Sequence, residues 1–313
     1  MRGVSGRVAC ASCLCLAAAA ASANDVPVFS SRTEIVRVDV SVVRDGQFVG
    51  GLQASDFEVW DNGVPQTVEI VGDPRAAGAG KVIDVLLALD VSQSVEGEPL
   101  RQLKAAAHTL VDALGPEDSL SVLTFSSRVR LAVSPGDSRA RAHELIEATR
   151  AQLTTSLYDA AFAAIATADP SRGRSLALVL SDGTDHGSWL APERVLRAAQ
   201  RSEQLVVHVI ETHQAAAEPA FLRELAVLTG GEVWRADYGR LREVLLKAIE
   251  EFRARYTLGF TRQRVLPSEW HDLEIRVRRN GARVRARSGY VDADARAPSG
   301  GAGAIPGWRL PPK

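Results

Sequence analysis

Cysteine is nearly absent from this sequence, since all three cysteines, Cys10, Cys13 and Cys15, lie close to the N-terminus. The rest of the chain has no thiol, which excludes disulfide bonds, thiol catalysis and zinc–thiolate sites there. The formal net charge is −1, from 37 basic and 38 acidic residues, so the chain as a whole does not attract a polyanion such as nucleic acid. With 46% hydrophobic and 24% charged residues, the composition is that of a globular protein with a buried core.

The N-terminus has the three parts of a secretory signal peptide. Arg2 and Arg7 precede the apolar run 8–21, and the small residues Ala21, Ser22 and Ala23 follow in the pattern of a cleavage site. The run is shorter than the roughly 20 residues of a membrane-spanning helix, which disfavours the alternative of a retained anchor. We therefore predict a signal peptide over 1–23, export to the periplasm or the extracellular space, and a mature chain without a transmembrane segment.

Two separate stretches have the alternating apolar and polar residues of antiparallel strands. The first, 32–72, contains the hairpin sequence Asp61-Asn62-Gly63, and the second, 255–292, contains the hairpin signal Asn280-Gly281. Each stretch is too small to be stable alone, so we expect the two to pair as halves of one small β-domain. The last residues, 293–313, are rich in Ala, Gly and Pro and are predicted to be disordered.

Between these stretches, residues 80–254 alternate between apolar strands and helices. Residues 82–89 are almost continuously apolar, which is typical of a strand covered on both faces in a parallel sheet. Further strands are expected at 120–125, 176–180 and 206–210, and helices at 99–114, 139–150, 158–167, 192–202, 219–229 and 238–253. The alternation predicts an α/β fold, with a doubly wound, mostly parallel sheet inserted in the small antiparallel β-domain.

Polar side chains follow two of these strands and precede one helix. Asp90, Ser92 and Ser94 come after the first apolar strand, Asp182 comes after 176–180, and Thr155 stands just before a helix. Taken singly, such residues are more often helix N-caps than ligands. Because the carboxyl ends of parallel strands meet in one crevice, however, we expect all three loops to converge.

The five side chains offer only hard oxygen donors, two carboxylates and three hydroxyls. This donor set suits a divalent cation, Mg2+ first and Mn2+ or Ca2+ as alternatives, rather than zinc or copper. Two carboxylates and weak hydroxyl ligands do not fill an octahedral shell. The predicted site therefore retains waters, or an open position for an oxygen atom from outside the chain.

At these residues, over roughly 82–252, the chain resembles a von Willebrand factor type A domain with the Asp-x-Ser-x-Ser, Thr and Asp pattern of a metal-ion-dependent adhesion site. The resemblance implies that five residues hold the cation directly or through water: Asp90, Ser92, Ser94, Thr155 and Asp182. The family usually has Gly-Gly before the threonine, where this chain has Leu153 and Thr154. Thr154 therefore stays open as an alternative to Thr155.

The flanking stretches resemble the exported, acidobacterial type of von Willebrand A-related proteins. On the N-terminal side the likeness lies in Asp56-Phe57-Glu58-Val59 and Asp61-Asn62-Gly63, and on the C-terminal side in 256–260 and Ser288-Gly289-Tyr290. Nearly the whole mature chain is then similar to that family. The likeness does not identify a ligand.

The open coordination shell and the resemblance together imply a non-enzymatic, metal-dependent binding module. In this hypothesis an Asp or Glu of an extracytoplasmic protein partner completes the shell, and nucleic acid is not a partner. The alternatives are a hydrolase that activates water on the same cation and a metal-stabilised scaffold without a ligand. Asp90 is disfavoured as a phosphotransferase nucleophile because Ser92 stands where a second carboxylate is needed. A serine hydrolase is disfavoured because no Gly-x-Ser-x-Gly elbow surrounds Ser92 or Ser94.

Four residues near these loops are candidates for contact with a partner: Gln93, Glu96, His186 and Trp189. The arginines within 276–287 are expected to form a basic strip on the solvated outer face of the last hairpin. His108 and His143, on predicted helices, and His208, within a predicted strand, are expected to be structural.

Overall fold

The computed structural model describes residues 35–74, 82–152, 154–172, 174–181, 184–212 and 220–292. All of them belong to one compact unit, Glu34–Lys313. The predicted signal peptide, the predicted C-terminal tail and Asp182 lie outside the described residues. Among the residues that are described, no helix is both long enough and apolar enough to cross a membrane.

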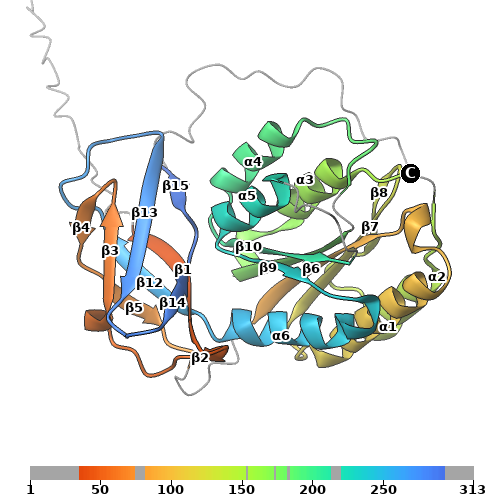
Figure 1. Cartoon of the computed structure of the whole chain (residues 1–313), viewed down its shortest axis with the longest axis horizontal. Coiled ribbons are helices and arrows are strands. Elements are labelled where there is room, and N and C mark those ends of the chain that lie inside the picture. The colour runs from red at the N-terminus through yellow and green to blue at the C-terminus, as the bar shows by residue number, and fades with distance from the viewer. Residues whose placement is uncertain are drawn as a thin grey trace, which may run out of the picture. The chain divides into compact units, whose positions relative to one another are not determined.

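The centre of the α/β part is a six-stranded sheet with the strand order β11-β10-β9-β6-β7-β8 (Figure 1). Its strands are β6 (Ile83–Asp90), β7 (Ser119–Phe125), β8 (Val129–Val133), β9 (Arg174–Ser181), β10 (Leu205–Glu211) and β11 (Val233–Arg235). Neighbouring strands pair in parallel, except that β8 runs antiparallel to β7. Every residue of β6 is buried, as its almost continuously apolar sequence predicts.

Helices cover both faces of this sheet, and each turns its apolar side towards the strands. One face carries α1 (Glu98–Ala113), α2 (Arg139–Ala148) and α6 (Leu241–Arg253). The other face carries α3 (Leu157–Thr167), α4 (Pro192–Arg201) and α5 (Ala220–Thr229). Short 3-10 helices lie at η1 (Ala54–Asp56), η2 (Gln93–Val95), η3 (Pro170–Arg172) and η4 (Tyr238–Arg240). The result is a doubly wound sheet, as the sequence predicts.

Two antiparallel sheets form the β-domain, one ordered β14-β1-β12-β5 with β2 paired to β1, and the other ordered β15-β13-β3-β4. Their strands are β1 (Ile35–Arg44), β2 (Gln47–Phe48), β3 (Phe57–Asp61), β4 (Val64–Gln66), β5 (Glu69–Gly72), β12 (Tyr256–Thr261), β13 (Trp270–Val277), β14 (Arg283–Arg285) and β15 (Gly289–Val291). β1 pairs with β12 and β3 with β13, so strands from before and after the α/β part share each sheet. The predicted fold class, an α/β sheet inserted in an antiparallel β-domain, is therefore confirmed.

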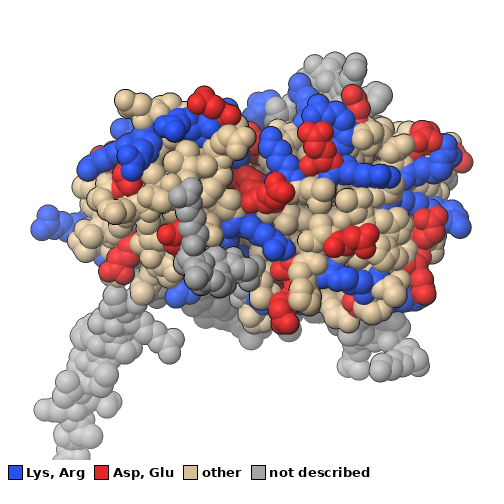
Figure 2. Space-filling view, turned by 90° about the horizontal axis from the view of Figure 1, so that it is seen from below, with Lys and Arg blue, Asp and Glu red and all other residues tan. Residues whose placement is uncertain are grey.

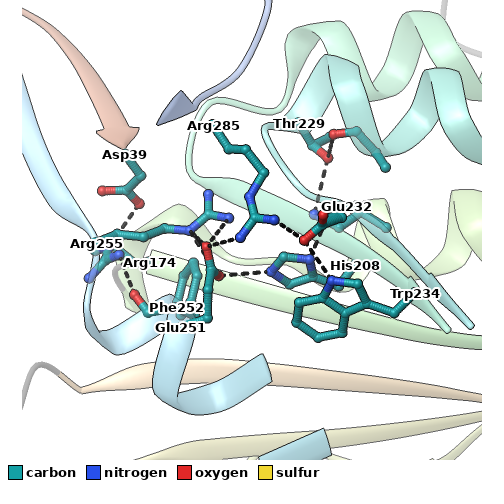
Figure 3. Close-up of polar contacts among 12 residues, drawn as sticks. Asp39, Arg174, His208, Thr229, Glu232, Trp234, Glu251, Phe252, Arg255 and Arg285 are labelled. Carbon is teal, nitrogen blue, oxygen red and sulfur yellow. Dashed lines mark hydrogen bonds and ion pairs between the residues drawn. The ribbon is translucent and has the colours of Figure 1, made fainter. Parts of the chain in front are cut away.

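A buried group of ion pairs joins the end of α6 to the strands around it (Figure 3). The guanidinium of Arg255, whose side chain is fully buried, donates to both carboxylate oxygens of Glu251 at 3.0 to 3.2 Å. Arg285 of β14 donates to the same carboxylate at 3.3 Å. Burial alone would raise the pKa of Glu251, but the Arg255 charge and the His208 N–H outweigh it and hold that pKa well below its ordinary value. The carboxylate therefore stays ionised inside the protein.

The expected hairpin at Asn280-Gly281 is wrong. The chain does turn there, but β13 pairs with β3 and β15, whereas β14 pairs with β1 in the other sheet. The turn signal is local and specifies a reversal of direction, while the packing of the two sheets decides which strands become partners.

The expected basic strip on a solvated face is also wrong in part. Arg287 is only 6% exposed, and it donates to the carbonyl oxygens of Gln200, Ser202 and Glu203 at the end of α4. A cation is favourable at the C-terminal end of a helix, where carbonyl groups lack partners. Figure 2 shows both basic and acidic side chains over one face.

His108 of α1 and His143 of α2 are partners of each other. Their Nδ1 atoms lie 2.6 Å apart, and the outer ring nitrogens face Glu147 at 3.4 Å and Asp112 at 2.9 Å. The two helices that carry them pack side by side. Sequence spacing gave no sign of this contact, because the two histidines belong to different helices.

Candidate metal centre

Three loops meet at the carboxyl edge of the central sheet. The first follows β6, the second leads from α2 into α3, and the third connects β9 to α4. Backbone hydrogen bonds join Gln152 N to Val91 O at 2.8 Å, between the first and second loops, and His186 N to Thr155 O at 2.9 Å, between the second and third. The described parts of these loops are thus in direct contact, as expected at the carboxyl ends of parallel strands.

Asp90 is a buried carboxylate at this edge, with 2% of its surface exposed. One carboxylate oxygen accepts a hydrogen bond from Ser92 N at 2.9 Å, and the other accepts one from Ser181 Oγ at 3.0 Å. Ser181 ends β9, the strand next to β6. Groups at two adjacent strand ends therefore fix the orientation of this carboxylate.

Ser92 and Ser94 place two hydroxyl oxygens beside each other. Their Oγ atoms lie 2.9 Å apart, because the 3-10 turn η2 bends the chain directly after Ser92. Ser92 is 3% exposed, whereas Ser94 lies at the surface. The pair therefore leads from the buried carboxylate of Asp90 to solvent.

The second loop carries Thr155 and contacts the first loop near Ser92. A parallel β-bridge between Ser92 and Gln152 fixes the loop three residues before Thr155. Thr155 is 4% exposed, whereas Thr154 is exposed. Ser156, the next residue, is also buried, and its Oγ has no hydrogen-bond partner in the described structure. Leaving a buried hydroxyl unpaired costs about 1–3 kcal/mol, so an added ligand or water here would be stabilising.

Two carboxylates hold the third loop against α3. Asp185 accepts hydrogen bonds from Leu157 N at 2.7 Å and from Ser188 Oγ at 2.6 Å, and thereby caps the N-terminus of α3. Asp159 accepts hydrogen bonds from the backbone N–H groups of Trp189 and Leu190, both at 3.0 Å. The loop is therefore anchored at both ends of its exposed stretch.

The predicted rim residues lie on these anchored loops, at the surface. Gln93, Glu96 and His186 are exposed, and Trp189 is 94% exposed. The third loop thus presents the large aromatic side chain of Trp189 to solvent on a fixed backbone.

The hydroxyl of Tyr158, on α3, stays protonated, because partial burial and the negative charges of Asp185 and Glu193 raise its pKa.

The donor atoms at this edge suit a hard divalent cation. A carboxylate and adjacent hydroxyl oxygens are available from Asp90, Ser92 and Ser94, and Ser156 Oγ has spare hydrogen-bonding capacity. Among the described residues, no three His, Cys, Asp or Glu side chains are grouped to hold a metal. The ligand roles of the five predicted residues stay a prediction, and Asp182 lies outside the described residues.

Sequence reasoning assigns no role to three residues that support this arrangement: Ser181, Asp159 and Asp185. Asp159 stands in the first turn of α3, where an acid is favoured by the helix dipole, so a local role could have been predicted. Its actual partners lie on the third loop, and Ser181 bonds to a residue on another strand. Contacts between segments so far apart leave no mark in the local sequence.

The fold and the oxygen-rich edge define a class, that of doubly wound α/β domains with a carboxylate-and-hydroxyl site at the carboxyl ends of the strands. A family model described as von Willebrand factor type A domain matches residues 84–257, more than half of the chain. The chain therefore belongs to the von Willebrand factor type A domain family, as the resemblance implied. A search of the curated proteins found no match.

Several solved structures are similar to this chain. A von Willebrand factor type A protein from Catenulispora acidiphila is 14% identical, with 84% of this chain and 75% of that one covered and a TM-score of 0.49. BatB from Bacteroides thetaiotaomicron is 18% identical, with 54% and 98% covered and a TM-score of 0.43. Proximal thread matrix protein 1 of the mussel byssus, with a zinc-occupied MIDAS motif, is 17% identical, with 57% and 47% covered and a TM-score of 0.47. Similarity at this level identifies no ligand or partner for the present chain.

Proposed function

We propose that this chain is an exported, non-enzymatic binding module that docks a protein partner through a metal-ion-dependent adhesion site. The observation that supports this most is the hydrogen-bonded group of Asp90, Ser92, Ser94 and Ser181 at the carboxyl edge of the sheet. Membership of the von Willebrand factor type A family agrees with a protein-binding role. The signal-peptide pattern of residues 1–23, and the flanking motifs shared with the exported acidobacterial type, support export.

In this proposal each predicted residue has a distinct role. Asp90 and Asp182 neutralise most of the charge of the cation, and Ser92, Ser94 and Thr155 position it. A bound Mg2+, Mn2+ or Ca2+ supplies an electrophilic centre to which a carboxylate oxygen from a partner binds. The exposed side chains of Gln93, Glu96, His186 and Trp189 then contact the partner around that carboxylate.

Capture of extracytoplasmic proteins on the immobilised full chain tests the proposal. The chain is exposed to envelope or culture proteins in Mg2+ or in EDTA, beside the variants Asp90→Ala and Asp137→Ala. Asp137 is a matched control, because its carboxylate accepts a backbone hydrogen bond in an exposed turn after β8, at the opposite edge of the sheet. We expect a set of proteins that is retained by the chain and by Asp137→Ala in Mg2+ and lost in EDTA or with Asp90→Ala. An identical retained set under all four conditions would show that the proposal is wrong.

The non-enzymatic part of the proposal has its own test. Incubation of the full chain with generic phosphate and ester substrates in Mg2+ should give no turnover above that of Asp90→Ala. A Mg2+-dependent rate that the Asp90 variant lacks would instead favour the hydrolase alternative, in which water is activated on the cation.

A further inference from the structure

A groove of about 630 Å3 runs along α3 and α4, on the sheet face opposite α1 and α6. The two helices pack side by side, and Figure 1 shows them over the same face of the sheet. The apolar part of the groove is formed by Phe162 and Ile165 of α3 and by Leu190, which precedes α4. Phe162 is 39% exposed, and Trp189, adjacent to Leu190 in the chain, is 94% exposed. Phe162 therefore leaves apolar surface of the groove open to solvent, whereas Trp189 does not line the groove.

The other side of the groove is basic. Arg194, Arg197 and Arg201 line it from successive turns of α4, and none of the described residues that line it is acidic. Arg201 has a surface ion pair with Glu269 at 3.6 Å. No described residue forms an ion pair with Arg194 or Arg197.

Of the three arginines, only Arg201, in the last turn, is favoured by the dipole of α4. Like charges three or four residues apart on a helix repel each other by a few tenths of a kcal/mol. Arg194 also lies in the first turn of α4, where the helix dipole disfavours a cation. Glu193 stands four residues before Arg197 on α4, but no ion pair joins it to Arg194 or Arg197 among the described residues. The row is therefore best explained by acids that come from outside the chain.

We propose that this groove binds an acidic amphipathic helix of a protein partner. Arg194 and Arg201 are seven residues apart, which corresponds to about 10.5 Å along α4. Acids at positions i, i+3 and i+7 of a partner helix have the same spacing, and the apolar stripe beside them would lie on Phe162, Ile165 and Leu190. Binding in the groove needs no divalent cation, so it is a second contact surface, distinct from the proposed adhesion site.

Fluorescence anisotropy with two labelled model peptides of about 20 residues, long enough to form helices, tests the proposal. The first peptide has leucines at i, i+3, i+4 and i+7 with glutamates along the flank of that stripe. The second has the same composition in scrambled order, so it keeps the charge and loses the stripe. The full chain is compared with the double variant Arg194→Gln/Arg197→Gln and with the control Arg101→Gln/Arg141→Gln. The control arginines are exposed, lie on α1 and α2 and pair with acids on their own helices. Both double variants change the formal net charge from −1 to −3.

We expect the amphipathic peptide to bind the full chain at least tenfold more tightly than the scrambled peptide does. The Arg194/Arg197 variant should weaken that binding at least tenfold, and Phe162→Ser should weaken it as well, while the α1/α2 control stays within about twofold. Far-UV circular dichroism and melting curves show whether each variant is folded. Binding should be the same in Mg2+, in EDTA and with Asp90→Ala, so the outcome does not depend on the adhesion site.

Three results would overturn the proposal. One is equal affinity for the amphipathic and scrambled peptides, and another is equal loss of binding in the two double variants. The third is an absence of peptide binding together with Arg194/Arg197-dependent binding to phosphatidylglycerol vesicles, which would assign the groove to an anionic lipid surface instead.

Discussion

The Nε2 atom of His208 lies 3.0 Å from a carboxylate oxygen of Glu251, joining β10 to the last turn of α6 (Figure 3). The Nδ1 atom of His208 accepts a hydrogen bond from Glu232 N at 3.1 Å, which leaves the proton on Nε2 and makes it the donor to Glu251. His208 is fully buried, and Trp234 stacks on its ring at 4.5 Å. A neutral imidazole in a fixed tautomer therefore completes the hydrogen bonding of a buried carboxylate.

This arrangement predicts a loss of stability in mild acid. Burial lowers the pKa of His208. The nearby Glu251 opposes this shift, whereas the charges of Arg255 and Arg285 add to it. Because the unfolded chain takes up a proton on this histidine below about pH 6.5 and the folded chain does not, the free energy of unfolding falls as the pH drops below that value. The slope attributable to one such group is at most about 1.4 kcal/mol per pH unit.

Urea unfolding at pH 7.5, 6.5, 5.5 and 5.0 measures that slope. We expect a shallower decline for His208→Gln than for the natural chain, since glutamine keeps a donor and an acceptor but does not titrate. His143→Gln, which changes a partly exposed histidine on α2, is the control. Parallel curves for the natural chain and His208→Gln would contradict the assignment of the acid sensitivity to His208.

Truncation of Glu251 should be strongly destabilising. Glu251→Ala leaves the fully buried guanidinium of Arg255 without its carboxylate and removes the acceptor of His208. Removing one partner of a buried ion pair typically costs about 3–5 kcal/mol. Glu243→Ala, which breaks an exposed ion pair between α6 and Arg240 of η4, should change the free energy of unfolding far less. Urea unfolding of the two variants compares the buried and exposed pairs directly, and similar costs would contradict this account.

Ser181→Ala should weaken cation binding without unfolding the protein. Ser181 Oγ orients the Asp90 carboxylate, and loss of such a supporting hydrogen bond typically lowers metal affinity by roughly tenfold or more. The same strand provides a control, because Ser175 Oγ lies 3.4 Å from Asp84 at the other end of β9 and β6. Calorimetric titration with Mg2+ or Mn2+ should show weaker binding for Ser181→Ala than for Ser175→Ala. Equal affinities would count against a role for this edge of the sheet in cation binding.

The sequence predicts those strands and turns whose structure depends on their own residues alone. The apolar run of β6 requires burial on both faces, and Asp61-Asn62-Gly63 forms the expected β3–β4 hairpin with positive φ angles of 47° at Asn62 and 77° at Gly63. β8 and β11 are not predicted. β11 has only three residues, none of them buried, so its strand conformation depends on its pairing with β10 rather than on its own pattern.

The candidate site likewise contains residues that the sequence indicates and contacts that it does not. Asp90, Ser92 and Ser94 are found from the sequence because one short segment after one buried strand carries all three. The hydrogen bond from Ser181 to Asp90 and the anchoring of Trp189 N by Asp159 are not found, since each joins segments whose proximity is decided by tertiary packing. The same reason explains why the sequence predicts the turn at Asn280-Gly281 but not the pairing of the strands on either side of it.

Asp159→Ala should loosen the third loop while leaving α3 intact. Its carboxylate accepts the N–H groups of Trp189 and Leu190, so their amide hydrogens should exchange faster with solvent in the variant, by about tenfold for each 1.4 kcal/mol of lost protection. Hydrogen exchange measured by mass spectrometry on peptides covering 184–191 reports this change. Glu144→Ala, on the surface of α2, should leave exchange in this stretch unchanged. No difference between the two variants would show that Asp159 does not hold the loop.

Gly231→Ala should prevent stable folding, because the backbones of two segments approach each other too closely for a side chain. A Cβ atom at Gly231 would lie 1.8 Å from the carbonyl oxygen of Val207 in β10, and neither backbone can move without disturbing the sheet. A clash of this kind should cost more than about 3 kcal/mol, since it cannot be relieved by rotation of a side chain. Gly239→Ala is the matched control, because a Cβ there meets no atom within 4 Å and its φ is not positive. Melting curves should show Gly239→Ala close to the natural chain and Gly231→Ala unfolded or melting far lower. Equal melting temperatures would contradict a close approach of β10 and the turn after α5.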